Sequence, residues 1–347
     1  MAVKKDDAAG LRKLKADLKD NTLGRCYLFC GEEAYLRDYY LGRMKAALLP
    51  QGMEEFNLHT LEGKSFTLHA LEEAVDCLPM MGERTLVVVT DLDLFKTAEV
   101  RDGVAALLPQ LPDYVCLVFL YDLIEYKADA RTKLAAALKE HATVVKFARQ
   151  DQGDLIDWVK RRFKALDKEI DAELARYLIF LCGDLMNGLI GEIEKIGAYA
   201  KNHRVTREDI DAVATPQLDA VVFQMTDALA AGNFDKAAAV LADLLHMQEP
   251  PIKLLAVLGK QLRQLYSARL ALEERKGAGA VAELWGMRSS YPAEKLMSAA
   301  RRFDLDWCRE AVVRAARTDL AMKSTGADGQ DLLVGLLMEL AALPTGR

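Results

Sequence analysis

The sequence predicts an α/β domain followed by an all-α region, and three observations support this fold class. Short apolar runs alternate with segments of helical spacing over the first 150 residues. From residue 151 onward, only helical patterns follow. The chain has 347 residues, 51% of them hydrophobic, so it is long enough for about two or three domains with buried cores.

Four apolar runs are expected to form a parallel sheet within residues 1–150. They are Cys26–Cys30, Thr85–Thr90, Tyr114–Leu120 and Thr143–Phe147. These runs are rich in apolar residues and do not alternate with polar ones, which is typical of parallel strands covered on both faces. Helical spacing in Tyr35–Leu49 and Arg131–Lys139 supplies helices between the strands.

A small helical module is expected over residues 151–215. Its predicted helices are Asp154–Ala165, Ala172–Cys182, Leu185–Ala200 and Thr206–Val213. Thr206 precedes Asp209 by three positions, a spacing that suits the start of a helix. The Thr215-Pro216 pair marks the end of the module.

Residues 216–347 are expected to form a second all-helical domain. Proline and glycine clusters at Pro250-Pro251, Gly277–Gly279 and Thr325–Gly329 separate its helices. The predicted helices are Val222–Ala231, Phe234–His246, Pro251–Arg275, Pro292–Phe303, Asp306–Met322 and Gln330–Leu343.

Composition excludes several classes of protein. The net charge is −6, so holding naked DNA by bulk charge alone is a poor candidate for the main activity. The charged segment Met1–Lys19 lacks the apolar core of a signal peptide, and no apolar stretch is long enough for a membrane span, which predicts a cytoplasmic protein. The six cysteines are scattered without a CxxC pair, so we expect reduced thiols and no metal site.

An α/β domain followed by a helical module suggests an ATPase of the AAA+ kind, but the expected phosphate loop is missing. The turn after the first strand reads Gly31-Glu32-Glu33, without Gly-Lys-Ser/Thr and with two carboxylates that would repel phosphate. Gly63-Lys64-Ser65 has the tail of such a motif but lacks its first glycine. Asp91 and Asp93 follow a strand as magnesium ligands would, yet a polar strand end is the simpler interpretation. We therefore expect no catalytic residue, no cofactor and no bound metal.

Several segments resemble one known family in their order and spacing. They are YLFCGEEAYL at 27–36, LPMMGER at 78–84, AAGNFDKA at 230–237, LGKQLRQLY at 258–266 and TDLAMKS at 318–324. Together they resemble the delta subunit of the bacterial DNA polymerase III clamp loader over nearly the whole chain.

The resemblance implies an architecture, a set of partners and a function. It implies an AAA+-like clamp-binding domain at 1–150, a helical lid at 151–215 and a helical collar at 216–347. Delta would not bind or hydrolyse ATP. It would bind the beta sliding clamp, favour its open form, and join gamma/tau and delta-prime subunits in a hetero-pentamer that acts on primer–template DNA. The assembly belongs to the polymerase III holoenzyme, a DNA-directed DNA polymerase and nucleotidyltransferase complex.

The clamp-contact element of the family corresponds to Leu71–Met81, where a helix ends in apolar residues. Helical spacing from Leu71 predicts one face packed inward, and Pro79 is expected to end the helix. The resemblance assigns clamp binding to Leu78, Met80 and Met81, and support to Pro79 and Arg84. The family often has an aromatic residue here, so the sequence does not show which side chain is the main anchor. The alternative interpretation is that Leu78 and Met80 belong to the core.

Three cations of the collar are candidates for contact with DNA phosphates. Lys260 and Arg263 share a helix face and Lys323 lies near the chain's end; a solvated surface is the alternative. Two other functions also stay open at this point: a P-loop ATPase with a degenerate site, and a helical adapter with no role in replication.

Overall fold

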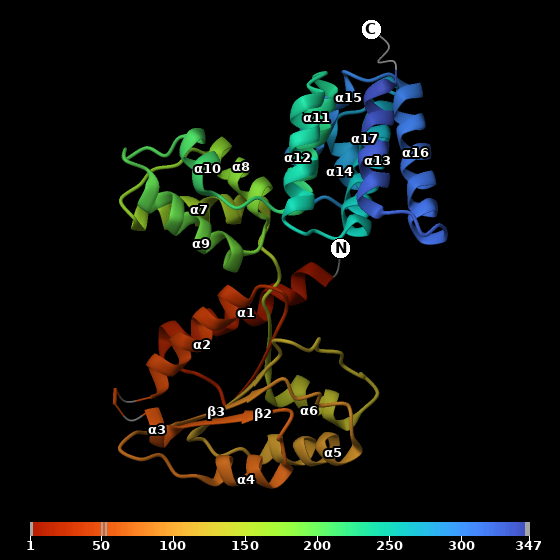
Figure 1. Cartoon of the computed structure of the whole chain (residues 1–347). Helices are drawn as coiled ribbons and strands as arrows, with labels where there is room; N and C mark the ends of the chain where they lie inside the picture. Colours follow the sequence, from red (N-terminus) through yellow and green to blue (C-terminus); the bar gives the residue numbers. More distant parts are fainter. Residues whose placement is uncertain (1–2, 50, 53, 344–347) are drawn as a thin grey trace. The chain divides into compact units, whose positions relative to one another are not determined.

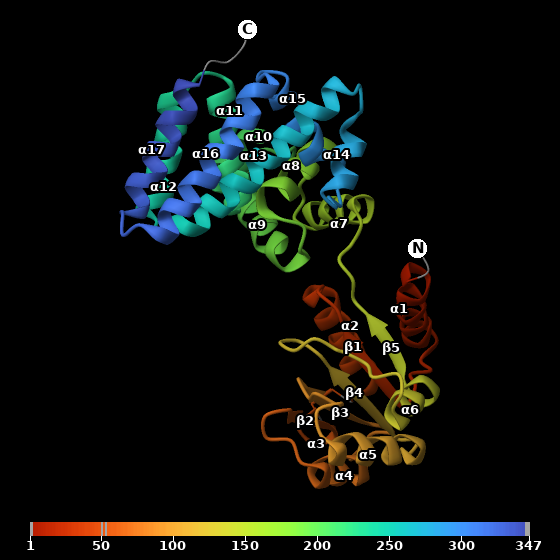
Figure 2. The same cartoon turned by 90° about the vertical axis from the view of Figure 1, so that its right-hand side faces the viewer.

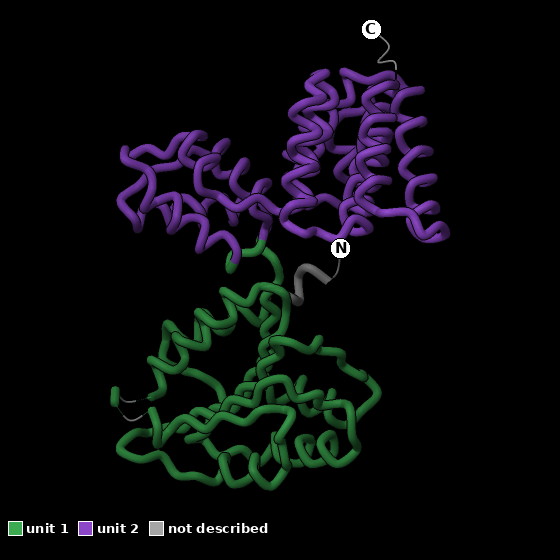
Figure 3. Tube along the Cα trace, viewed as in Figure 1, with its two compact units in different colours: residues 1–150, 185–187 green, residues 151–184, 188–347 purple. Residues whose placement is uncertain are grey.

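The structure is a computed structural model that describes residues 3–49, 51–52 and 54–343. The chain divides into two compact units, shown in different colours in Figure 3. Unit 1 comprises residues 1–150 and 185–187, and unit 2 comprises residues 151–184 and 188–347. The finer division at residue 215 into lid and collar stays a prediction.

Unit 1 is built on a parallel sheet of five strands in the order β2-β3-β4-β1-β5 (Figure 2). The strands are β1 (Cys26–Cys30), β2 (Leu58–Glu62), β3 (Thr85–Thr90), β4 (Val115–Leu120) and β5 (Thr143–Lys146). The four predicted strands are therefore present, and the register pairs Leu28 with Phe119 and Val144 in the centre of the sheet. The edge strand β2 was not predicted. Its residues are partly exposed, and its sequence, LHTLE, contains no apolar run.

Helices cover both faces of the sheet (Figure 1). One face packs against α1 (Val3–Asp20) and α2 (Ala34–Leu48), and the other against α4 (Leu68–Asp76), α5 (Ala98–Leu107) and α6 (Lys133–His141). The short helices α3 (Glu54–Asn57) and η1 (Leu108–Gln110) complete the unit. Helix α1 was not predicted, because its sequence is mostly polar.

Side-chain alternation along each strand divides the core of unit 1 into two layers. Tyr27 and Phe29 face α1 and α2, whereas Leu28 faces α4, α5 and α6. The Tyr27 hydroxyl donates a 2.8 Å hydrogen bond to Asp17, which fastens α1 to its face of the sheet. Since both layers are apolar, the strands show the unbroken apolar runs from which the sheet was predicted.

The residues of unit 2 that the structure describes, 151–184 and 188–343, contain helices but no strand beyond an isolated bridge between Glu169 and Arg204. The helices are α7 (Gln152–Ala165), α8 (Ala172–Cys182), α9 (Met186–Tyr199, whose first two residues lie in unit 1), α10 (Arg207–Val213), α11 (Leu218–Ala230), α12 (Phe234–His246), α13 (Pro251–Glu273), α14 (Ala278–Leu284), α15 (Ser290–Ala300), α16 (Leu305–Ser324) and α17 (Gly329–Ala342). Helices α11 to α17 enclose one apolar core. The predicted fold class, α/β plus all-α, is confirmed.

Helix α10 begins with the reciprocal cap that its sequence suggested. The Thr206 hydroxyl accepts a 3.3 Å hydrogen bond from the backbone of Asp209, whose carboxylate accepts a 2.9 Å bond from the Thr206 amide. Such a capping box satisfies two amides that a helix start otherwise leaves unpaired.

Replacing Thr206 by alanine is expected to lower the free energy of unfolding of unit 2 by about 1 kcal/mol, because the cap is lost. All three tryptophans, Trp158, Trp285 and Trp307, lie in unit 2, so their fluorescence during urea unfolding measures this change. Thr206→Ser keeps the hydroxyl and serves as the control. Equal midpoints for the alanine and serine variants would contradict the prediction.

Among the described residues, no single helix is both long and apolar enough to cross a membrane. Helices α8 and α9 meet the test of length and composition only as a joined pair, bent by 118° at the break between them.

Candidate functional site

The segment between α4 and β3, residues 77–84, carries three exposed apolar side chains, and we call it the tip loop. Leu78, Met80 and Met81 are 68%, 53% and 82% exposed. Helix α4 beneath the loop is anchored by Leu71 and Val75, which are buried against the sheet. An exposed apolar group of this kind is typical of a site that meets a partner.

The prediction that the helix continues as far as Pro79, with Leu78 on its inward face, is wrong. Helix α4 ends at Asp76, and Cys77 is already extended. The physical reason is Pro79, since the residue before a proline avoids the helical region of backbone space. Leu78 therefore leaves the buried face of the helix and lies in solvent.

Arg84 fixes the end of the tip loop. Its guanidinium donates hydrogen bonds to the backbone carbonyls of Leu23, Gly24 and Val115, the last two at 2.9 Å. Thr85, the next residue, donates its amide to Tyr114 at 2.8 Å and begins β3. Arg84 thus ties the loop to the β1 and β4 ends of the sheet, in keeping with a supporting role.

Asn57 fixes the middle of the tip loop, a role that sequence reasoning missed. Its fully buried side chain accepts a 2.7 Å hydrogen bond from the Met80 amide and donates a 2.9 Å bond to the Met80 carbonyl. The register of the sheet explains the reach, because Leu58 pairs with Leu86, which places Asn57 beside the segment that enters β3.

Met81 has a φ of 55°, in the left-handed region that side chains other than glycine, asparagine and aspartate seldom adopt. Such a conformation persists only where the surroundings fix it. The bonds to Met80 on one side and from Arg84 on the other supply that constraint. The backbone of the tip loop is therefore fixed, and its apolar side chains are exposed to solvent.

The tip loop carries one thiol of its own, Cys77, which is free and partly buried. A second cysteine, Cys116, lies close to Arg84, and burial raises the pKa of its thiol to about 12 although the charge of Arg84 opposes the shift. The thiol is therefore protonated at neutral pH and cannot act as a nucleophile. What the site offers is apolar surface for binding.

The turn where an ATPase would hold phosphate is closed by the protein's own groups. Gly31 has a φ of 113°, and a side chain there would approach the Phe147 carbonyl to 2.4 Å. The Glu33 carboxylate is fully buried and accepts a 3.2 Å hydrogen bond from the backbone amide of Met186, a residue of unit 1. Glu32 forms an ion pair with Arg149 at 2.7 Å.

The acidic pair after β3 serves the backbone. One carboxylate oxygen of Asp91 accepts hydrogen bonds of 2.8, 2.9 and 3.3 Å from the amides of residues 122–124, and Asp93 accepts one from Phe95. A side chain on Gly63 would lie 2.1 Å from the Asp91 carbonyl, so this glycine is required for close packing. These contacts favour the structural interpretation of both segments.

Arg37, another residue that sequence reasoning missed, lies at the same edge of the sheet. It is 3% exposed, donates a 3.0 Å hydrogen bond to the Tyr121 carbonyl, and forms an ion pair with Asp122. The arginine thereby places a fixed positive charge of the protein beside the carboxyl ends of β1 and β4.

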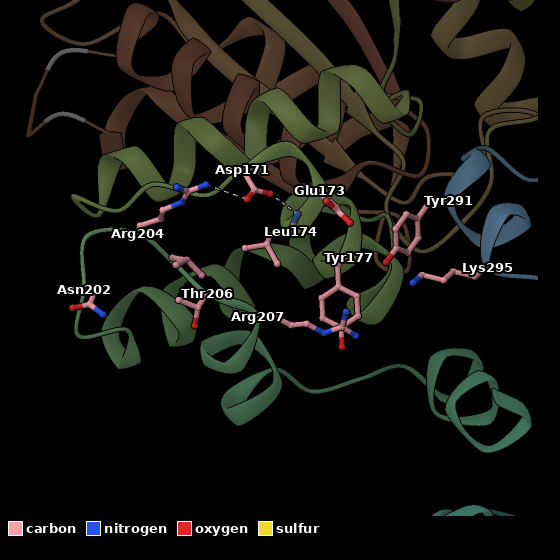
Figure 4. Close-up of a pocket in the computed structure, with 11 residues that line it drawn as sticks. Asp171, Glu173, Leu174, Tyr177, Asn202, Arg204, Thr206, Arg207, Tyr291 and Lys295 are labelled. Carbon is pink, nitrogen blue, oxygen red and sulfur yellow. Dashed lines mark hydrogen bonds and ion pairs between the residues drawn. The ribbon is translucent and has the colours of Figure 1, made fainter. Parts of the chain in front are cut away.

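Unit 2 contains a cavity of about 540 Å³ between α8, α10 and α15 (Figure 4). The Arg207 guanidinium lies 4.2 Å from the centre of the Tyr177 ring, and Arg204 pairs with Asp171 at 3.5 Å. Burial raises the pKa of Tyr177 to about 12, so the phenol is neutral. Arginine and carboxylate charges at this cavity therefore offset one another in part.

Lys260, Arg263 and Lys323, the three cations predicted to face DNA, all lie on the surface of unit 2. Lys260 pairs with Asp219 at 3.0 Å and Lys323 with Asp319 at 2.7 Å, while Arg263 lies one turn beyond Lys260 on α13. Their contact with DNA stays a prediction. Among the residues that the structure describes, no group of three or more His, Cys, Asp or Glu side chains could hold a metal ion.

A five-stranded parallel sheet followed by a helical unit, with an exposed apolar loop on the first, agrees with the clamp-loader subunit that the sequence motifs predicted. The fold is similar to that of a Bacillus subtilis DNA clamp loader delta protein, with a TM-score of 0.57 and 23% identity over 95% of this chain and 99% of that one. Models of the DNA polymerase III delta subunit and of its C-terminal domain match residues 27–148 and 219–340. The chain belongs to the DNA polymerase III delta-subunit family.

Two relatives from bacteria extend the match over nearly the whole chain. The sequence is 25% identical over 330 residues to the Bacillus subtilis DNA polymerase III subunit delta, covering 93% of this chain and 94% of the relative. It is 20% identical over 313 residues to the Escherichia coli subunit, covering 90% and 89%. The family was thus identified correctly from the sequence motifs.

Proposed function

We propose that this chain binds the beta sliding clamp through Leu78, Met80 and Met81 and favours the open form of the ring. The observation that carries the proposal is the exposure of these three side chains on a loop whose backbone Asn57 and Arg84 hold. The chain would act in the cytoplasm within a hetero-pentamer of gamma/tau and delta-prime subunits, and would meet primer–template DNA through that complex.

The apolar surface is large enough for a real but limited affinity. Burying three such side chains fully contributes about 5–9 kcal/mol in total. Association costs at least about 4 kcal/mol in lost freedom. The tip alone therefore binds weakly, and further contacts from unit 1 are needed for a stable complex.

Opening of the ring depends on a difference in affinity. A protein that binds the open and closed clamp equally well does not shift the equilibrium between them, however tightly it binds. The experiment that tests the proposal is retention of purified chain on two forms of clamp, one free to open and one closed by crosslinks. Stronger retention on the free form is expected, whereas no retention on either would favour a helical adapter.

The chain is expected not to bind ATP. Glu33, Arg37 and Asp91 are all engaged with the protein's own backbone where an ATPase would hold phosphate and magnesium. Titration calorimetry with Mg-ATP should show no binding heat. An affinity in the micromolar range would instead favour the degenerate P-loop ATPase.

A further inference from the structure

We propose that Asn57 is the positioning residue of the clamp-binding tip. Its buried amide holds the tip loop, through the backbone of Met80, in the conformation that exposes the apolar side chains before any partner arrives. The inference rests on the proposed function and adds to it a residue outside the tip loop, on a different element.

Asn57 holds the backbone of Met80 through two hydrogen bonds. A primary amide has one good acceptor and one donor group side by side, and Asn57 uses them on the amide and the carbonyl of the same residue, Met80. A buried amide is costly without partners, so these bonds stabilise the arrangement in which both groups are satisfied. A side chain that bonds both backbone groups of one residue restricts both of its dihedral angles.

The tip side chains supply little that would hold the loop in place. Leu78, Met80 and Met81 lie largely in water, so burial within the chain contributes little to fixing them. The left-handed backbone of Met81 adds a local cost that the fixed points on either side must offset. Asn57 therefore orders the tip loop before the clamp binds. This order reduces the loss of conformational entropy that binding would otherwise require.

The test uses the full chain with Asn57→Ala and Asn57→Asp. Aspartate keeps an acceptor for the Met80 amide but sets a carboxylate oxygen against the Met80 carbonyl, so an intermediate effect is expected. Val145→Ala is the matched control, because Val145 is fully buried on β5, at the opposite edge of the sheet from β2. It lowers the stability of unit 1 without touching the tip loop.

Two measurements separate positioning from general stability. Hydrogen exchange of residues 77–84, without clamp, should be faster in Asn57→Ala by about tenfold or more and unchanged in Val145→Ala. Clamp affinity should fall by about tenfold in Asn57→Ala, through the loss of preorganisation, and stay at the wild-type value in Val145→Ala. Asn57→Asp should lie between wild type and alanine in both, and decides the matter if the alanine variant does not fold.

Each outcome decides one statement. If hydrogen exchange in the tip loop is unchanged in Asn57→Ala, Asn57 does not hold the loop. If exchange is faster but the clamp affinity is unchanged, Asn57 holds the loop without contributing to binding. A wild-type chain that fails to bind the clamp would instead overturn the proposed function, and the exchange measurement would still show whether Asn57 holds the loop.

Discussion

Replacing Met80 and Met81 together by alanine is expected to weaken binding to the sliding clamp by about a hundredfold and to leave the fold intact. Each substitution removes apolar contact worth about 1.5 kcal/mol or more in the complex, and a few central apolar anchors usually carry most of an interface's energy. Both side chains are exposed in the free chain, so the free energy of unfolding should change by less than about 0.5 kcal/mol. Surface plasmon resonance against immobilised clamp, with thermal unfolding alongside, measures both quantities.

The chain offers its own matched control for this experiment. Met247 and Met338 are also exposed methionines, at 72% and 68%, but lie in unit 2, at the end of α12 and within α17. Replacing this second pair by alanine should leave clamp binding unchanged. If the two double variants bound the clamp equally well, the tip would be misplaced. If only one of Met80 and Met81 accounted for the loss, that residue would be the main anchor.

Replacing Arg37 by alanine is expected to lower the free energy of unfolding of unit 1 by about 3 kcal/mol, because removing one partner of a buried ion pair leaves the other groups without compensation. Arg37 bonds both the Tyr121 carbonyl and the Asp122 carboxylate, so the substitution also frees a buried acceptor. Since Asp122 is partly exposed, water offsets some of the loss and the estimate lies at the low end for such pairs.

The measurement separates the two units by their chromophores. Tryptophan fluorescence follows unit 2 alone, because unit 1 has no tryptophan. Far-UV circular dichroism records the helices of both units, so the part of its transition that has no counterpart in fluorescence reports the unfolding of unit 1. Arg37→Ala should shift the circular dichroism transition and leave the fluorescence transition in place, while Arg37→Lys should fall between alanine and wild type. A shift below about 1 kcal/mol would show that the ion pair contributes no more than an exposed one does.

The sheet was predictable because burial on both faces leaves a direct trace in the sequence. Strands β1, β3 and β4 are buried apolar runs, and the helices of unit 2 follow apolar spacing and caps such as Thr206. Strand β5 lies at the other edge of the sheet and is less buried, but its adjacent valines still marked it as a strand. Strand β2 was not predictable in this way, because an edge strand with one half-exposed face carries polar residues. Its place in the sheet depends on pairing with β3, a long-range contact that no local pattern records.

The apolar residues of the tip could be predicted, but the means of holding them could not. Leu78, Met80 and Met81 stand out as an apolar run broken by proline. Asn57 bonds a backbone 23 residues away, and Arg84 bonds three carbonyls from other segments. Bonds from a side chain to a distant backbone place no demand on the partner's residue type, so they leave no signature in a single sequence.

The exposure of Met80 and Met81 has a chemical consequence beyond binding. Peroxide oxidises exposed thioether sulfurs to polar sulfoxides and is itself reduced to water, whereas Met44 and Met225 are shielded in their cores. Peroxide would therefore make Met80 and Met81 polar before it reached the buried methionines. Such oxidation would weaken the proposed binding to the sliding clamp, while the circular dichroism and fluorescence of the folded chain would stay unchanged.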